Sequence, residues 1–435
     1  MVKKFVHKAK SAASDKFIVQ SIRTMMLRVL GVMVLFGFTF FITNNYPARI
    51  VGQYDFVRSF LLIVGSLCLL GTDQSVLYYS GRLRSSNSIH ELMSVYKKML
   101  AIILLASFAV FLIVVMAENP INAFFDDPAV HPIIFKCSAV LFFNGLTLLN
   151  TEVFRAMGFN YLSEMFRNII KYVPVITGAV LLLIIHQENY LVDFYIFGFV
   201  ALGLITTGMV FYYLNRIEHG EQTPRISVKE IVVTSYPIAM SGMAVFLLMG
   251  IDIMLLKKYQ GSEVVAYYGV AVKLMTMLSV IVVTVNVTLS TKIAELFTAG
   301  DHGALRQKVK SGSKLIFLLT SPAAAVICIF PETILHLFGE HYESARDALI
   351  ILTLSQWICS YFGVVTVYLN MTRKQHIFQY ILIVAVIINF IMNSLLIPEY
   401  GMTGAAISFA VSILFWNIVS AIVIYKTDKL NLFWI

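Results

Sequence analysis

The residues of this sequence that could do chemistry are charged side chains set inside long apolar stretches. Four of them are cations: Arg28, Arg58, Arg155 and Lys273. If the stretches cross a membrane, a charge near the bilayer centre costs about 2.5–3.5 kcal/mol, so such residues usually face a wet cavity or a partner. Deep charges that are mainly positive suit an anionic substrate, and phosphate is the obvious anion. We therefore predict that these four cations bind phosphate in a central cavity.

Three acidic residues lie in the same kind of stretch. They are Asp73, Asp252 and Glu152. Each could carry a coupling proton or sodium ion. Glu152 and Arg155 are three residues apart and therefore share one helix face, which also fits a local helix pair.

Simpler interpretations of the charges stay open. Arg28, Arg58 and Arg155 are near enough to the ends of their stretches to reach the membrane surface with their long side chains. Asp252 and Lys273 could form a structural ion pair between adjacent helices. Lys273 is the hardest to explain in this way, because it is the deepest cation.

No catalytic or metal-binding pattern accompanies the charges. The histidines are scattered, HExxH is absent, and the four cysteines lie in apolar runs without metal-ligand spacing, where we expect buried free thiols. A GxxxxGK[ST] motif is also absent, which excludes ATP-driven transport by this chain alone. Asp126 and Asp127 precede Pro128 and are typical of a solvated turn. We expect no enzyme, no metal and no cofactor beyond a coupling H⁺ or Na⁺.

The composition is that of a membrane protein. Of 435 residues, 59% are hydrophobic and 13% charged, and the mean hydropathy is +0.81. A soluble domain is about 25% charged, and 13% could not cover a soluble surface of this size. The composition therefore excludes cytosolic enzymes, secreted proteins and disordered proteins.

Hydropathy predicts an all-α polytopic protein with about twelve transmembrane helices. Each span needs about 20 apolar residues, and the loops between them are too short for a soluble domain. The expected spans are 24–43, 56–80, 99–117, 133–155, 168–186, 193–214, 232–256, 264–290, 313–333, 347–370, 376–397 and 403–425.

The basic residues predict the orientation. With the N-terminus in the cytoplasm, 26 of the 33 lysines and arginines lie at inner ends, six at outer ends, and Lys273 within a span. This bias is typical of cytoplasmic loops. It explains the net charge of +9 without nucleic acid and places both termini inside.

The two halves of the chain resemble each other at an offset of about 214 residues. Residues 50–54 align with 264–268, and residues 124–127 with 338–341. Repeats in the same orientation usually flank a central substrate cavity. We predict two pseudo-symmetric six-helix bundles around such a cavity. The expected boundaries are an N-terminal bundle at 1–217 with a short cytoplasmic tail, a cytoplasmic linker at 218–231 and a C-terminal bundle at 232–435.

Several short motifs, in order along the whole chain, resemble one known group of transporters. They are the arginine-containing start of the first span (28–31), a Gly-Gln-Tyr turn (52–54), a Gly-x-Asp segment (71–75), the span 7–8 signature (250–255 and 266–271) and two outer turns (338–342 and 397–406). The chain resembles the polysaccharide-exporter branch of the multidrug/oligosaccharidyl-lipid/polysaccharide (MOP) superfamily, specifically the O-antigen flippases of bacterial envelopes.

The resemblance implies a function without a chemical reaction. Members of this branch move undecaprenyl-diphosphate-linked oligosaccharide from the cytoplasmic to the periplasmic leaflet of the inner membrane by alternating access. Arg28 would correspond to a cavity arginine of the peptidoglycan-precursor flippases. Lys273 stands where those relatives carry arginine, which keeps the charge but loses bidentate geometry. The expected partners are the lipid-linked oligosaccharide, the bilayer, a polysaccharide polymerase and a chain-length regulator.

Three alternatives remain from the sequence. A drug or cation antiporter of the same fold would favour acidic and aromatic residues, and Lys273 argues against it. A membrane polysaccharide polymerase or glycosyltransferase would need a long outer loop with acid and base groups. A structural scaffold would not require charges inside the membrane.

Overall fold

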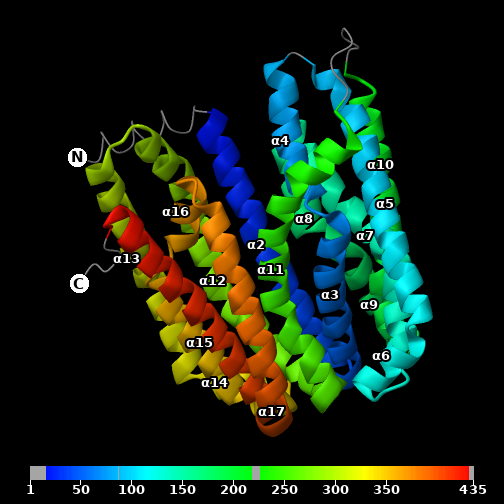
Figure 1. Cartoon of the computed structure of the whole chain (residues 1–435). Coiled ribbons are helices and arrows are strands. Elements are labelled where there is room, and N and C mark those ends of the chain that lie inside the picture. The colour runs from blue at the N-terminus through cyan, green and yellow to red at the C-terminus, as the bar shows by residue number, and fades with distance from the viewer. Residues whose placement is uncertain (1–15, 87, 218–225, 431–435) are drawn as a thin grey trace, which may run out of the picture. The chain divides into compact units, whose positions relative to one another are not determined.

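The structure is a computed structural model that describes residues 16–86, 88–217 and 226–430. The N-terminal tail and most of the expected linker at 218–231 lie outside these ranges. Within them every regular element is a helix, as Figure 1 shows, and the all-α fold is confirmed. The α-helices are α2 (Lys16–Asn45), α3 (Ala48–Leu69), α4 (Thr72–Ser85), α5 (Leu92–Met116), α6 (Glu118–Phe125), α7 (Val130–Ala156), α8 (Asn160–Asn168), α9 (Val173–Ile184), α10 (Leu191–Leu214), α11 (Val228–Gln260), α12 (Ser262–Thr298), α13 (His302–Ile329), α14 (Pro331–His336), α15 (Arg346–Ser360), α16 (Val365–Met371) and α17 (Gln375–Asp428).

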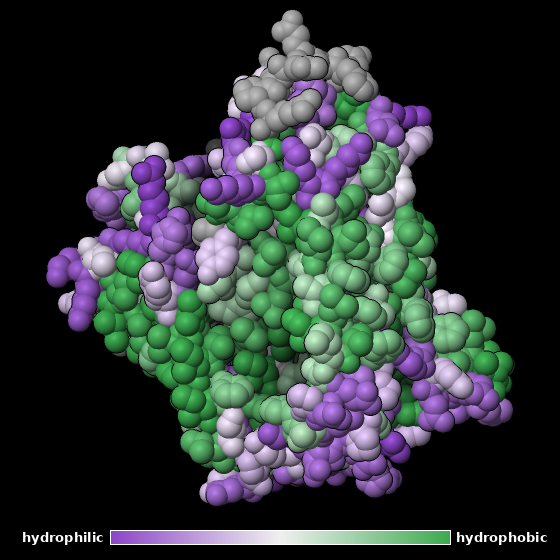
Figure 2. Space-filling view, turned by 45° about the vertical axis from the view of Figure 1, so that its right-hand side comes forward, coloured by the Kyte–Doolittle hydropathy of each residue, from purple (hydrophilic) through white to green (hydrophobic). Residues whose placement is uncertain are grey.

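In the described part of the chain, nine helices are long and apolar enough to cross a membrane, or ten with the bent pair α15–α16. Figure 2 shows the matching surface: apolar residues fill the middle of the face in view, and hydrophilic residues gather toward its upper and lower ends. The 54 residues of α17 would extend about 80 Å, against a hydrocarbon core of about 30 Å. The helix is interrupted at Gly401 (φ 54°, ψ −128°), so it contains both of the last two expected spans.

The second expected span, 56–80, is wrong in its boundaries. The structure begins α3 at Ala48 and ends it at Leu69, and α4 starts a new helix at Thr72. Leu70 and Gly71 both have positive φ, which ends the helix. A side chain at Gly71 would also lie 2.5 Å from the Ser235 carbonyl oxygen, so this turn requires glycine.

The chain forms two compact units, and neither is a continuous half of the sequence. Unit 1 comprises Met1–Phe38, Gly65–Met116 and Phe135–Ala239, and unit 2 comprises Thr39–Val64, Ala117–Ile134 and Met240–Ile435. Parts of α2 and α3, and the whole of α6, therefore group with the C-terminal helices. The expected boundary between the two bundles stays a prediction.

Each unit has its own apolar core. In unit 1 the core joins side chains of α4, α5, α7, α8 and α10, with Tyr79, Tyr96 and Phe154 among its fully buried members. In unit 2 it joins α11, α12, α13, α16 and α17 around Ile316 and Tyr368. Within a bilayer such cores depend on close packing, because lipid tails are as apolar as the side chains.

Unit 2 brings α3 against α12 at positions that the sequence repeat makes equivalent. A Cβ on Gly52 would lie 1.6 Å from the Ser262 carbonyl oxygen and 3.2 Å from the Ala266 nitrogen. A Cβ on Gly269 would lie 2.4 Å from Asp55 Oδ2. Gly52 and Ala266 are 214 residues apart, and so are Asp55 and Gly269. Contact between equivalent positions is what a two-fold axis between the helices produces.

Gly52 should therefore be intolerant of even one added methyl group. We expect Gly52→Ala to destabilise the protein by at least about 1–3 kcal/mol, since the backbones of α3 and α12 must separate. Thermal unfolding in detergent measures the loss. Gly37→Ala on α2 is the matched control, because no atom lies within 4 Å of its added Cβ. Equal melting temperatures for the two variants would contradict this account of the packing.

Candidate functional site

Lys273, the deepest predicted cation, is paired with a carboxylate that the sequence analysis did not select. Its Nζ lies 2.7 Å from Asp55 Oδ1 and 2.8 Å from Asp55 Oδ2. Lys273 is 2% exposed and Asp55 is fully buried. The pair joins α12 to α3 inside unit 2. The structure therefore pairs Lys273 with Asp55 and not with Asp252.

Arg58 completes this group from the next turn of α3. Its Nε lies 3.5 Å from Asp55 Oδ1, and its side chain is 29% exposed. The Lys273 ammonium also lies 5.9 Å from the centre of the Tyr54 ring, within the range of a cation–π contact. Asp55 thus serves two cations, one buried and one partly exposed. Gly269, one turn before Lys273, leaves the space that the carboxylate occupies.

Asp252 lies apart from the cations. Its Oδ2 accepts a hydrogen bond of 2.7 Å from the Tyr268 hydroxyl. The residue is 2% exposed, and Oδ1 has no hydrogen-bond partner in the described part of the chain. A buried carboxylate of this kind is costly when ionised.

Unit 1 contains a second group, in which Arg28 and Arg155 share one carboxylate. Arg28 on α2 donates to both oxygens of Glu164 on α8, at 3.1 Å from Nε and 2.8 Å from Nη2. Arg155 on α7 contacts Glu164 Oε1 at 2.9 Å. Asn168 donates to Glu164 Oε2 at 2.7 Å. Glu164 is 1% exposed, so these donors replace the water it lacks.

Glu152 extends the same group to a third arginine. Arg155 lies 3.0 Å from Glu152 on the preceding turn of α7, which confirms that they share a helix face. Glu152 also pairs with Arg167 on α8. Asp73, the remaining predicted acid, accepts a hydrogen bond from Gln74. Three arginines and two carboxylates are therefore linked by ion pairs in unit 1.

The three arginines remain able to contact a ligand. Arg28 and Arg167 keep 33% of their side chains exposed, and Arg155 keeps 25%, while Glu152 and Glu164 are almost fully buried. A guanidinium has five N–H donors in a planar fork that matches phosphate oxygens. The carboxylates that hold the arginines are therefore buried, while the arginine side chains stay partly exposed.

The structure thus gathers most of the predicted residues but in two separate units. Arg28, Arg155 and Glu152 belong to the unit 1 group, which we call the arginine cluster and which also contains Glu164 and Arg167. Asp73 also lies in unit 1. Arg58 and Lys273 belong to the unit 2 group with Asp55. The described residues contain no set of three His, Cys, Asp or Glu side chains that could hold a metal ion.

Asp55, Glu164 and Arg167 were missed because they lie just outside the expected spans. Asp55 directly precedes the expected start at residue 56. Glu164 and Arg167 fall between the expected spans 133–155 and 168–186. Asp55 and Glu164 could have been found by asking which opposite charge neutralises a cation inside the membrane, and Arg167 by asking the same of Glu152.

Comparison with known proteins gives the family. The family described as polysaccharide biosynthesis protein matches residues 4–290, which is well over half of the chain. The chain belongs to this family. The MatE family matches residues 237–395. An uncharacterised membrane protein of Methanocaldococcus jannaschii is 24% identical over 405 residues, covering 84% of this chain and 75% of that protein.

Solved structures of the MOP superfamily share the fold of this family member. The lipid II flippase MurJ in an inward closed conformation has a TM-score of 0.69 and 13% identity, covering 94% of this chain and 88% of that one. An inward-facing multidrug resistance MATE transporter has a TM-score of 0.66 and 14% identity, covering 93% and 96%. Two six-helix bundles are the architecture of these neighbours, and the predicted fold class is confirmed.

Because Asp55 pairs with two cations, substituting Asp55 should destabilise the protein more than substituting Lys273. Asp55→Asn would leave Lys273 buried beside Arg58 without a carboxylate, and we expect a loss of about 3–5 kcal/mol. Lys273→Met should cost less, because Arg58 still neutralises Asp55. The double variant Asp55→Leu with Lys273→Met should recover most of the stability. Unfolding in detergent tests the order, with Lys292→Met on an exposed pair as control. A larger loss for Lys273→Met than for Asp55→Asn would contradict it.

Proposed function

We propose that this protein is a flippase for undecaprenyl-diphosphate-linked oligosaccharide, moving it from the cytoplasmic to the periplasmic leaflet. The arginine cluster carries the proposal. It offers three partly exposed guanidiniums inside a membrane fold, held by carboxylates that are buried beneath them. A diphosphate is the anion such a group would bind, through charge-assisted and bidentate hydrogen bonds. Membership of the polysaccharide biosynthesis protein family supports an oligosaccharide cargo.

On binding, phosphate oxygens would replace the carboxylate oxygens of Glu164 as the acceptors of the Arg28 hydrogen bonds. Glu164 satisfies Arg28 with two hydrogen bonds, and a phosphate can accept the same two. The guanidinium then passes from carboxylate to phosphate without losing its charge partner, which keeps the cost of desolvation low. In unit 2, the partly exposed Arg58 would bind the cargo in the same way, while the buried Lys273 stays paired with Asp55.

The membrane potential favours the proposed direction. Moving one charge across 100 mV is worth about 2.3 kcal/mol, and an inside-negative potential drives an anion outward. Asp73, Glu152 and Asp252 are the candidates for an H⁺ or Na⁺ coupled to this step. We further propose a bacterial inner-membrane location with both termini in the cytoplasm, bundles at 1–217 and 232–435, and a polymerase and chain-length regulator as partners.

A small-molecule antiporter is the second candidate, because the MatE family matches residues 237–395. A cationic drug would have to bind beside Lys273 and Arg58, however, and like charges in a low dielectric repel strongly. A polymerase remains the least supported option, since no long outer loop is expected from the sequence.

The position of the substrate in cells that lack this protein tests the flippase function. We expect undecaprenyl-linked oligosaccharide to accumulate on the cytoplasmic side, because no other step is removed. Accessibility of its sugars to a periplasmic probe measures this, and adding the gene back is the control. Accumulation of single repeat units on the periplasmic side would mean that translocation is intact and would favour the polymerase.

Variants of Arg28 test whether the arginine cluster binds phosphate. Loss of a charge-assisted hydrogen bond costs about 1.5–3 kcal/mol, or roughly ten- to a hundredfold in binding. We expect Arg28→Ala to lose translocation by this factor and Arg28→Lys to lose less, because lysine keeps the charge without the fork. Surface polysaccharide at matched expression is the readout. The control is Arg82→Ala, which removes an exposed arginine paired with Glu230. Equal activity of the two Arg28 variants would count against a phosphate role.

A further inference from the structure

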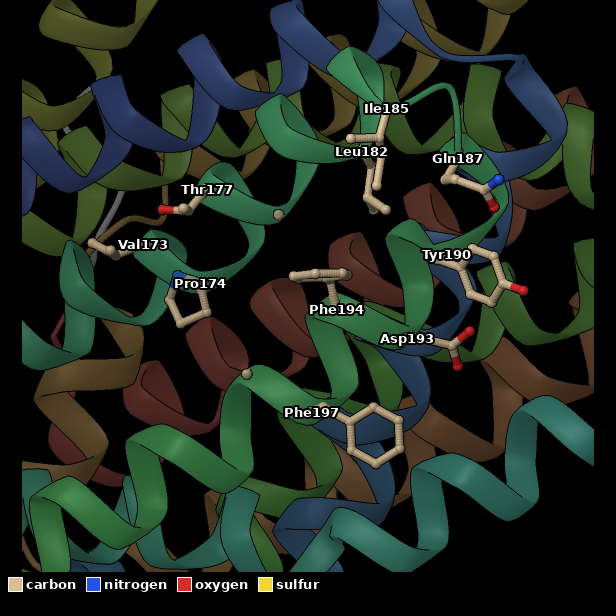
Figure 3. Close-up of a pocket in the computed structure, with 12 residues that line it drawn as sticks. Val173, Pro174, Thr177, Leu182, Ile185, Gln187, Tyr190, Asp193, Phe194 and Phe197 are labelled. Carbon is tan, nitrogen blue, oxygen red and sulfur yellow. The ribbon is translucent and has the colours of Figure 1, made fainter.

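An apolar groove lies between α9 and α10 in unit 1. Its volume is about 820 Å³. In Figure 3, Val173, Pro174 and Thr177 lie at one end, Gln187, Tyr190 and Asp193 at the other, and the Phe194 ring between them. The remaining lining comes from Leu182, Ile185, Phe197 and the glycines Gly178 and Gly198.

The surroundings of the groove require a hydrocarbon occupant. Both helices belong to candidate membrane spans, Asn160–Ile184 and Glu188–Leu214. An open apolar hollow at that depth meets lipid chains and no water. The 12 residues of α9 extend about 18 Å, so the groove can follow a chain through much of one leaflet.

Two basic residues precede Val173, which lies at one end of the groove. Arg167, a member of the arginine cluster, lies six residues before Val173, and Lys171 lies two residues before it. The turn Ile170–Tyr172 joins α8 to α9, so Arg167 is within about 12 Å of the groove along the chain. Lys171 sits over the Tyr172 ring at 4.9 Å from its centre. The basic residues could therefore bind the anionic head of a lipid while the adjacent groove binds its apolar tail.

The opposite end of the groove is polar but electrically balanced. Lys136 Nζ lies 2.7 Å from Asp193 Oδ1, which neutralises both groups. This end suits the interface between chain and water and does not attract a second anion. The charges therefore favour a ligand whose anionic head lies at the Val173 end of the groove and whose tail points toward Asp193.

We propose that the α9–α10 groove binds the polyprenyl chain of the lipid-linked substrate, with its phosphates toward Arg167 and Lys171. The inference rests on the proposed flippase function, because it takes the diphosphate lipid as the ligand. It adds a site for the tail, on the outer face of two helices that carry no member of the arginine cluster. The tail then stays in contact with lipid while the phosphates are held by protein.

Photocrosslinking tests the site directly. Thr177 lines the groove and Val180, one turn further along α9, is exposed but does not line it. Each is replaced in turn by the photoreactive residue p-benzoylphenylalanine, in the full chain. The protein is placed in vesicles of phosphatidylethanolamine and phosphatidylglycerol with undecaprenyl diphosphate as the probe, and adducts are identified by mass. We expect a polyprenyl adduct at 177, phospholipid adducts only at 180, and loss of the polyprenyl adduct when Arg167→Gln and Lys171→Gln are added.

The outcomes separate this inference from the flippase function. Phospholipid adducts alone at 177, or equal polyprenyl adducts at 177 and 180, would overturn the groove assignment. Translocation measured in the same vesicles decides the other question: transport without a polyprenyl adduct at 177 overturns the tail site alone. A polyprenyl adduct at 177 without transport supports the site and counts against the proposed function.

Discussion

A charge inside a bilayer must have a partner, and the two charged groups of this protein follow from that constraint. Three buried carboxylates each serve two cations: Asp55 serves Lys273 and Arg58. Glu164 serves Arg28 and Arg155, and Glu152 serves Arg155 and Arg167. The carboxylates are buried and most of the cations are partly exposed. This arrangement gives each cation a partner inside the membrane fold, so that its burial is compensated.

Sharing also explains how the same cations could be structural and functional. A cation paired with a carboxylate of its own would be fully neutralised. When two cations share one carboxylate, each keeps N–H donors that the carboxylate does not use. In the proposed function, an incoming phosphate would bind one cation while the carboxylate stays paired with the other. The pair is never reduced to an isolated buried charge, which is the state that costs several kcal/mol.

Residue type and hydropathy predicted the helical membrane fold and the cations, because both depend on composition over tens of residues. Residue type and hydropathy did not identify three of the charged residues that form the ion pairs. Arg49, Gln53 and Asp55 lower the hydropathy at the start of α3, so the expected span began at 56 and left Asp55 outside. Glu164 and Arg167 fell between two expected spans for the same reason, although α8 is a helix. Hydropathy therefore discards the ionisable residues whose partners make burial possible, and only the packing of α3 on α12 or α8 on α7 restores them.

The repeat adds a reason why the halves differ where they touch. On a two-fold axis, equivalent residues oppose each other, and two carboxylates there would collide and repel. The sequence has Asp55 in the first half and Gly269 at the equivalent position in the second, where a Cβ would lie 2.4 Å from the carboxylate. The second half contributes its charge one turn later, as Lys273, and the first half has Ser59 at that equivalent position. The contact of α3 with α12 thus joins an acid from one half of the sequence to a base from the other.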